Sequence, residues 1–169
     1  MKIIEKAIVY GDDINTDLII AGKYTKTLNK QDLVDHVMED LDPEFKKKSA
    51  GGAIVVAGEY FGCGSSREQA PVALLGSGVK CVVAKSFSRI FYRNAINIGL
   101  PIVECDTSFI SDGDILEYEL GGTVLYDRTN GVSASITPLP DLMVSILESG
   151  GMVPFMKTYG GFEAFTKRE

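Results

Sequence analysis

Short apolar runs recur along the first two thirds of the chain, and each has the length of a strand. Lys2–Val9 is rich in β-branched residues, as are AIVVAG (53–58) and KCVVAKS (80–86), and LPIVEC (100–105) continues the series. An uninterrupted apolar run of this length is typical of a strand buried on both faces. We therefore expect these stretches to form the inner strands of a sheet.

An amphipathic stretch follows the first strand. In residues 29–41 the apolar side chains repeat at helical spacing, at Leu33, Val34, Val37, Met38 and Leu41. Asn29 is placed to cap this helix, because an asparagine side chain accepts a hydrogen bond from the first free backbone N–H groups. The Asp42-Pro43 pair is expected to end it.

Two further helices are expected between the later strands. One runs over about Glu68–Leu75, has Pro71 in its first turn and is closed by the glycines of residues 76–78. The other lies within SFSRIFYRNAINIG (86–99) and ends at Gly99. Two successive passages from strand to helix predict a parallel sheet with helices packed on it.

The last third of the chain has a different pattern. GDILEYEL (113–120), GGTVLYD (121–127) and GVSASIT (131–137) are short β-like runs separated by glycine turns, which predicts an antiparallel meander. A final helix is expected over Pro140–Glu148, and about 156–169 as a C-terminal tail. We therefore expect one α/β domain, residues 1–169, with a mostly parallel sheet, helices and an added meander.

Composition narrows the function classes. The 169 residues are 45% hydrophobic and 24% charged, which is typical of a soluble globular protein. A net charge of −6 argues against nucleic-acid binding, which depends on clustered cations, and the run Lys46–Lys48 is interpreted as a solvated face. No apolar stretch approaches the roughly 20 residues that span a bilayer, so we expect neither export nor a membrane anchor.

Three cysteines, Cys63, Cys81 and Cys105, are spread widely along the chain. None belongs to the close C-x-x-C pairs from which zinc and iron–sulfur sites are usually built, and an odd number does not indicate a disulfide framework. We therefore expect a reducing, cytoplasmic location and no metal ligated by this chain.

The stretch YFGCGSSREQAP (60–71) carries the strongest chemical signal. Ser65 to Glu68 fits the S-x-x-E capping box, so one interpretation is a plain helix cap. The other is an anion site, because two hydroxyls, free N–H groups and the Arg67 guanidinium meet at a helix N-terminus, where negative charge is favoured. Gly62 and Gly64 leave a ligand close access to the backbone.

Two more stretches combine polar groups. GDDINTD (11–17) contains three aspartates, which we interpret as turn and cap chemistry in preference to a metal site. SFSRIFYRNAINIGLP (86–101) carries Arg89 and Arg93 one helical turn apart, and we interpret it as a core helix whose arginines form salt bridges outward. The single histidine, His36, is expected at the surface.

Together, GDDINTDLIIAGKY, FGCGSSREQAP and SFSRIFYRNAINIGLP resemble the small subunits of 3-isopropylmalate dehydratases, the swivelling domain of the aconitase superfamily. The resemblance extends from about Lys2 to Phe155. It implies a swivelling β/β/α domain like the fourth domain of aconitase. The usual motif of that family is GSSREHAP, so Gln69 is a departure where histidine is expected.

The resemblance also implies a mechanism. In that family a large subunit carries a [4Fe-4S] cluster whose open iron binds the substrate hydroxyl, so this chain would act as a hydro-lyase only with that partner and would hold no cluster itself. Ser65 would be the catalytic base. Ser66 and Arg67, with Gly64 beside them, would bind a carboxylate of a hydroxy di- or tricarboxylate substrate.

The substrate is expected to be set by a loop at Tyr24, Thr25, Lys26 and Thr27. In the family, Tyr-Leu-Val-Tyr here suits an alkyl group and Tyr-Leu-Arg-Thr an extra carboxylate, and this chain matches neither. The overall resemblance favours isomerisation of 2- and 3-isopropylmalate in leucine biosynthesis. Related 2,3-dimethylmalate, methylmalate or homoaconitate dehydratases, a non-catalytic binding module, and a self-sufficient enzyme with its own cluster are the alternatives.

Overall fold

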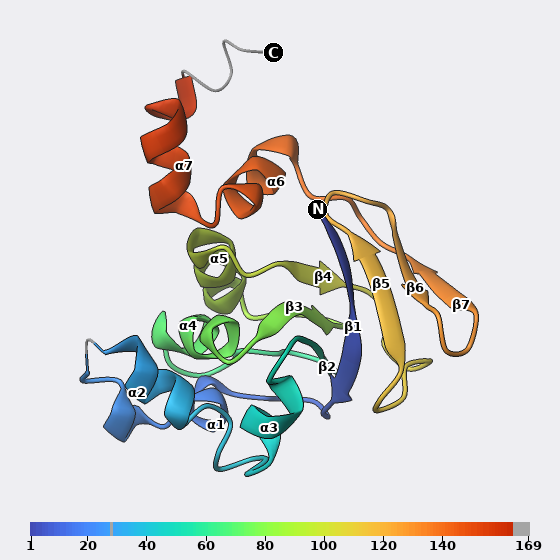
Figure 1. Ribbon diagram of the computed structural model, residues 1–169, viewed down its shortest axis with the longest axis horizontal. Helices are drawn as coiled ribbons and strands as arrows, with labels where there is room; N and C mark the ends of the chain where they lie inside the picture. The colour runs from blue at the N-terminus through green and yellow to red at the C-terminus, as the bar shows by residue number, and fades with distance from the viewer. Residues whose placement is uncertain (28, 164–169) are drawn as a thin grey trace.

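The computed structural model describes residues 1–27 and 29–163 and contains one seven-stranded mixed sheet. Its strand order is β4-β3-β2-β1-β5-β6-β7 (Figure 1). The strands are β1 (Lys2–Val9), β2 (Ala53–Ala57), β3 (Val79–Ala84), β4 (Ile102–Glu104), β5 (Ile115–Glu119), β6 (Val124–Asp127) and β7 (Val132–Ser135). The sheet therefore confirms the α/β class and all seven strands expected from the sequence.

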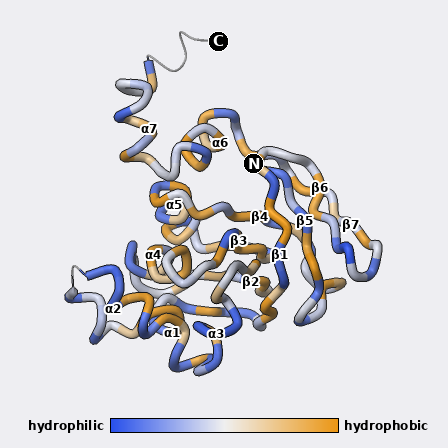
Figure 2. The backbone as a smooth tube through the Cα atoms, viewed as in Figure 1, coloured by the Kyte–Doolittle hydropathy of each residue, from blue (hydrophilic) through white to orange (hydrophobic). Residues whose placement is uncertain are grey.

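The first four strands run parallel and form the core. β1 pairs with β2 in the register Ala7↔Ile54, and β2 pairs with β3 in the register Ile54↔Cys81. Every residue of β2 is buried, which explains why its sequence is apolar without alternation. Figure 2 shows this hydrophobic centre continuing from the strands into the helices beside them.

The helices are α1 (Thr16–Ile19), α2 (Lys30–Asp35), α3 (Phe45–Ser49), α4 (Gln69–Gly76), α5 (Arg89–Ile98), α6 (Asp141–Glu148) and α7 (Met152–Tyr159). In Figure 1, α1 to α5 lie on the side of the parallel strands away from β6 and β7. The expected ends of α4 and α5 are confirmed: Gly78 and Gly99 have the positive φ values of +107° and +86° that suit glycine after a helix.

The helix expected over residues 29–41 is shorter than its apolar pattern suggested. Asn29 caps α2 through Gln31 N, but the helix stops at Asp35. Met38 has φ +57° and donates its N–H to the carbonyl of Ile19, 2.8 Å away, while its side chain is fully buried. Tertiary packing therefore overrides helical periodicity here.

Helix α3 contains the lysine run, and the pattern of residues 45–49 did not predict a helix. Lys46, Lys47 and Lys48 are exposed and lie beside Asp35, Glu44 and Asp42, respectively. The interpretation of this run as a solvated face is confirmed. Phe45, at the start of the same helix, is completely buried and anchors it to the core.

Helix α6 was expected to be the last helix, and α7 shows that this was wrong. The expected tail is described as far as residue 163: residues 156–159 belong to α7, residues 160–163 follow it, and residues 164–169 lie outside the described part. Pro154 stands in the first turn of α7, where a missing N–H is tolerated. Phe155 of this helix is fully buried, so the helix is packed onto the rest of the fold.

The meander is confirmed as antiparallel, with β5 paired to β1 and to β6, and β6 paired to β7. Its Asn130-Gly131 turn is stabilised by the buried carboxylate of Asp127, which accepts hydrogen bonds from Asn130 and from Thr129 N. These bonds hold the pKa of Asp127 below its usual range, against the effect of burial. Within residues 1–27 and 29–163, no helix has the length and apolar character needed to cross a membrane.

Candidate active site before helix α4

Two chain segments run side by side where the parallel strands β1 and β2 end. Gly62 N donates to the carbonyl of Ile14, and Thr16 N donates to the carbonyl of Cys63, both at 2.8 Å. The hydroxyl of Thr16 donates to the carbonyl of Ser65 at 3.0 Å. The motif that begins at Phe61 is therefore fixed by residues 14–16, almost fifty positions earlier in the chain.

The start of helix α5 supports the same loop from the other side. Ser88, the N-cap of α5, donates its N–H to the carbonyl of Phe61 and its hydroxyl to the carbonyl of Gly62, at 2.9 and 2.7 Å. Gly62 has φ +76°, and a Cβ on it would lie 2.2 Å from the ring of Phe91. Gly62 therefore allows close packing, and the stretch 86–101 supports the loop of residues 60–71.

Ser65 and Ser66 are exposed immediately before helix α4. Neither hydroxyl, and none of the N–H groups of Gly64, Ser65 and Ser66, has a hydrogen-bond partner among the described residues. The capping-box interpretation was wrong, because the N-cap of α4 is Glu68 and no side chain caps it. The helix start keeps free donors, as an anion site requires.

Arg67 is held by residues that lie about fifty positions earlier in the chain. Its Nη1 forms an ion pair with Asp17 and donates to the carbonyl of Ile20 at 3.3 Å. Nη2 lies against Gly22, where an added Cβ would be only 3.0 Å away. The side chain is 20% exposed. The guanidinium is thus fixed by one nitrogen, which leaves Nε and Nη2 for a ligand.

The predicted specificity loop begins beside this arginine. The side-chain amide of Gln69 donates to the carbonyl of Thr25 at 3.4 Å, and Thr25 in turn donates its hydroxyl to the carbonyl of Gly22 at 2.8 Å. Lys26 is exposed, and Thr27 accepts from Asn29 N and donates to Asp32. The fold brings Thr25 to the start of α4.

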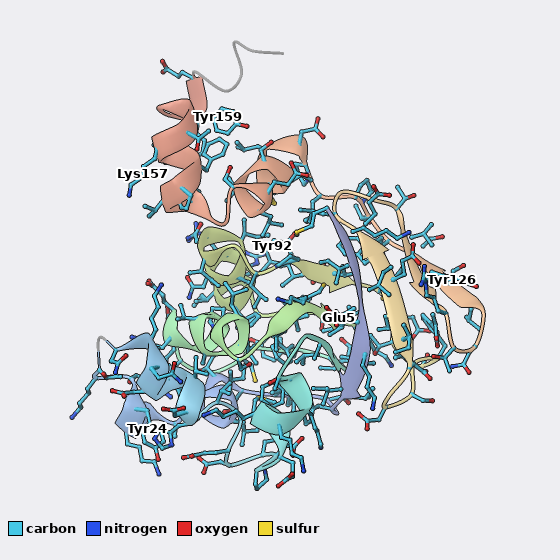
Figure 3. The ribbon with its side chains drawn as sticks, viewed as in Figure 1. Glu5, Tyr24, Tyr92, Tyr126, Lys157 and Tyr159 are labelled. Atoms are coloured by element: carbon cyan, nitrogen blue, oxygen red, sulfur yellow. The ribbon has the colours of Figure 1, made fainter. Side chains whose placement is uncertain are left out.

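Tyr24 anchors the loop on the other side. Its ring stacks on the imidazole of His36, with centroids 3.7 Å apart and planes only 4° apart. His36 Nδ1 lies 2.7 Å from a carboxylate oxygen of Glu39, and this contact lowers the pKa of Glu39. His36 was expected at the surface, but its stack on Tyr24 leaves it half-buried. Tyr24 is shown in Figure 3.

The aspartates of residues 11–17 stabilise a turn and form an ion pair. Asp12 accepts from Glu59 N at 2.7 Å, and Asp17 pairs with Arg67. Asn15 caps the short helix α1 through Leu18 N at 3.0 Å. Within the described residues there is no group of three or more histidine, cysteine or acidic side chains that could hold a metal ion.

The three cysteines are free thiols. Cys81 is buried in β3, and burial raises its pKa well above the usual range. Burial also raises the pKa of Cys105, to about 11, and that of Cys63. Since the thiolate is the form that ligates metals, burial works against metal binding at all three positions.

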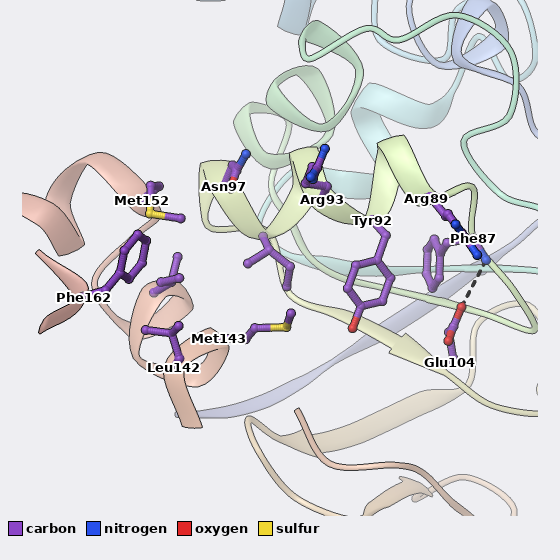
Figure 4. Close-up of a pocket in the computed structure, with 12 residues that line it drawn as sticks. Phe87, Arg89, Tyr92, Arg93, Asn97, Glu104, Leu142, Met143, Met152 and Phe162 are labelled. Atoms are coloured by element: carbon purple, nitrogen blue, oxygen red, sulfur yellow. Dashed lines mark hydrogen bonds between the residues drawn. The ribbon is translucent and has the colours of Figure 1, made fainter. Parts of the chain in front are cut away.

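Arg89 and Arg93 lie away from the candidate site. They line an apolar cavity of about 470 Å³ between α5, α6 and α7, together with Tyr92, Met143 and Phe162 (Figure 4). Both arginines are exposed, and neither forms an ion pair with another described residue, so the expected outward salt bridges are not found. No residue of the GSSR motif lines this cavity.

The chain matches the model of the aconitase C-terminal domain family over residues 6–107. It is 50% identical over 161 residues to the 3-isopropylmalate dehydratase small subunit 2 of Archaeoglobus fulgidus, which covers 95% of this chain and 98% of that protein. The chain belongs to the family of 3-isopropylmalate dehydratase small subunits. The family includes a Pyrobaculum neutrophilum small subunit that is 52% identical over 95% of this chain and 99% of the relative.

The family's fold is confirmed by a solved structure. The crystal structure of a 3-isopropylmalate dehydratase from Methanocaldococcus jannaschii matches this chain with a TM-score of 0.90 and 41% identity, with both chains fully covered. The family assignment expected from the three motifs is thus confirmed, and so is the aconitase-type fold.

Proposed function

We propose that this chain is the small subunit of a hydro-lyase that interconverts 2-isopropylmalate and 3-isopropylmalate by dehydration and rehydration. The observation that carries the proposal is the arrangement before helix α4, where two free serine hydroxyls adjoin an arginine that Asp17 fixes in place. Membership of the 3-isopropylmalate dehydratase family supports the same reaction.

Ser65 is the proposed base. Dehydration requires removal of a proton from the carbon beside a carboxylate, while the hydroxyl leaves the neighbouring carbon. Ser65 Oγ would take that proton, and it would return a proton when water adds in the other direction. A serine alkoxide needs stabilisation, which the helix N-terminus, the free N–H groups and Arg67 would supply once a partner excludes water.

Ser66, Arg67 and Gly64 are the proposed carboxylate site. A planar guanidinium can bind a carboxylate through two parallel hydrogen bonds, and Arg67 has Nε and Nη2 outside the contacts with Asp17 and Ile20. The lack of a side chain at Gly64 leaves a ligand access to the backbone, and the lack of one at Gly22 makes room for the Arg67 guanidinium. Tyr24, Thr25, Lys26 and Thr27 would face its variable group.

The proposed partner is a cluster-bearing large subunit. The described residues of this chain do not fit a [4Fe-4S] cluster, because they offer no group of three ligands and their thiol pKa values are raised. The large subunit would supply the Lewis acid that activates the leaving hydroxyl. The free thiols also fit a reducing compartment, so we propose a cytoplasmic location.

The test is to purify the chain together with the large subunit under anaerobic conditions and to measure hydration of 2-alkylmaleates. We expect activity only with both subunits, and the highest kcat/KM with the isopropyl compound. A complex that turns over 2,3-dimethylmalate or a tricarboxylate better would assign the chain to a related dehydratase. A complex that turns over none of these compounds would contradict the proposal.

A further inference from the structure

Tyr60 has an unusual conformation for an exposed aromatic residue. Its φ is +58°, in the left-handed region that asparagine and glycine adopt far more readily than tyrosine, yet 53% of its surface is exposed. Its N–H donates to the hydroxyl of Ser86 at 2.8 Å, and this hydroxyl donates to Glu59 at 2.6 Å. The backbone is therefore fixed while the ring remains largely in solvent.

The same hydrogen-bonded segments carry Tyr60 and the candidate active site. Gly58 N donates to the carbonyl of Gly11, and Asp13 N donates to the carbonyl of Glu59, at 3.1 and 2.9 Å. Farther along, the bonds between residues 14–16 and 62–65 continue this pairing. Tyr60 and Ser65 consequently lie along one edge of the molecule, where β1 and β2 end.

Three acidic residues lie on the same hydrogen-bonded segments as Tyr60. Asp12, Asp13 and Glu59, which we call the acidic rim, are all exposed, and no described basic residue forms an ion pair with them. Such charges repel an anionic substrate that approaches the neighbouring serines. These charges no longer oppose substrate binding once cations of another molecule pair with them.

We propose that Tyr60 and the acidic rim are the docking contact for the large subunit, whose matching surface is basic and has a recess for the tyrosine ring. This inference rests on the proposed function. Tyrosine is one of the residues in which binding hot spots are enriched, because it buries a large ring while its hydroxyl can keep a hydrogen bond. A second copy of this chain fits less well, because it would present the same negative charges.

The decisive variant is Tyr60→Asn, because asparagine accepts the left-handed backbone and removes only the ring. We expect the large-subunit concentration that gives half-maximal activity to rise at least tenfold. We also expect the thermal midpoint of the free small subunit to stay the same or rise, since the strain at position 60 is relieved. A purely structural tyrosine would give the opposite result, a lower midpoint with unchanged affinity.

Tyr126→Asn is the matched control. Tyr126 is 40% exposed on β6, at the side of the molecule away from α1 and α4 (Figures 1 and 3), and this change should leave affinity for the large subunit as in the wild type. Asp13→Asn tests the charge. Asparagine accepts the positive φ of Asp13, +55°, so the variant removes the charge without straining the backbone. We expect this variant to associate with the large subunit more slowly, and the effect to be largest at low salt. If the association rate of this variant depends on salt as that of the wild type does, the acidic rim is not part of the contact.

The outcomes separate this inference from the proposed function. If the wild-type chain neither binds a large subunit nor gains activity with it, the proposed function fails. If the wild-type complex forms and is active but Tyr60→Asn binds equally well, the docking contact is wrong and the proposed function stands.

Discussion

Asp17 forms an ion pair with Nη1 of Arg67 across 50 positions of sequence. Together with the Ile20 carbonyl, this contact holds one edge of the guanidinium and leaves the other open. An exposed ion pair contributes little stability by itself. Its effect here is to orient a side chain that the proposed reaction needs in one geometry.

Arg67→Lys is therefore expected to be a severe change. A lysine ammonium cannot pair with Asp17 and offer two parallel donors to a carboxylate at the same time. We expect kcat/KM of the assembled enzyme to fall roughly 30- to 1000-fold, about 2–4 kcal/mol. Arg128→Lys, at an arginine paired with Glu117 in the meander, is the control. Equal activity of the two variants would contradict the carboxylate assignment.

Ser65→Ala and Ser66→Ala should separate the proposed roles of the two hydroxyls. Loss of the base lowers kcat and leaves KM nearly unchanged, because the base acts in the transition state. Loss of a carboxylate donor at Ser66 mainly raises KM. Steady-state kinetics of both variants with the isopropyl substrate test this. A normal kcat for Ser65→Ala would exclude it as the base.

Gln69 is expected to tune substrate binding through Thr25. The amide hydrogen bond to the Thr25 carbonyl joins the start of α4 to the proposed specificity loop, so Gln69→Ala should raise KM about 2- to 10-fold, the range of one neutral hydrogen bond. Gln69→His should retain part of this contact. Gln31→Ala, at a surface glutamine bonded to Asp35, is the control. If KM does not change, the loop position is independent of residue 69.

Lys26→Val tests whether the loop selects charge. Lys26 is exposed, so its cation is available to a negatively charged substituent and its stem to an alkyl one. If the cation selects, turnover of a tricarboxylic substrate should fall at least ~10-fold while that of isopropylmalate is retained. Lys47→Val, on helix α3, controls for loss of a surface charge. Equal losses with both substrates would show that Lys26 does not discriminate.

Replacing Cys63, Cys81 and Cys105 together by alanine should leave the iron content of the assembled enzyme unchanged. The raised pKa values keep these thiols protonated at neutral pH, and a protonated thiol is a poor ligand. Some thermal stability should be lost, because Cys81 packs in β3 as a small hydrophobic residue. Iron analysis and a thermal melt measure the two effects. Loss of iron would place a cluster ligand on this chain.

The strands and the ends of α4 and α5 could be predicted because they depend on near neighbours. The run Ala53–Ala57 is apolar throughout because both faces of β2 are covered, and Gly99 ends α5 because only its left-handed φ satisfies the last carbonyls. The Asn130-Gly131 turn follows from the same local chemistry. The motif at Ser65–Arg67 could also be found, since its residue types are adjacent in sequence.

Contacts between distant segments were decided only by the tertiary structure. Periodicity predicted a helix through Met38, but the Met38 N–H donates to the Ile19 carbonyl and the helix ends before it. The sequence offered a capping box at Ser65, whereas the fold closes the loop through Thr16 and leaves the hydroxyl free. Propensity and spacing act over a few residues, while the Asp17–Arg67 pair and the left-handed Tyr60 depend on which loops the sheet brings together.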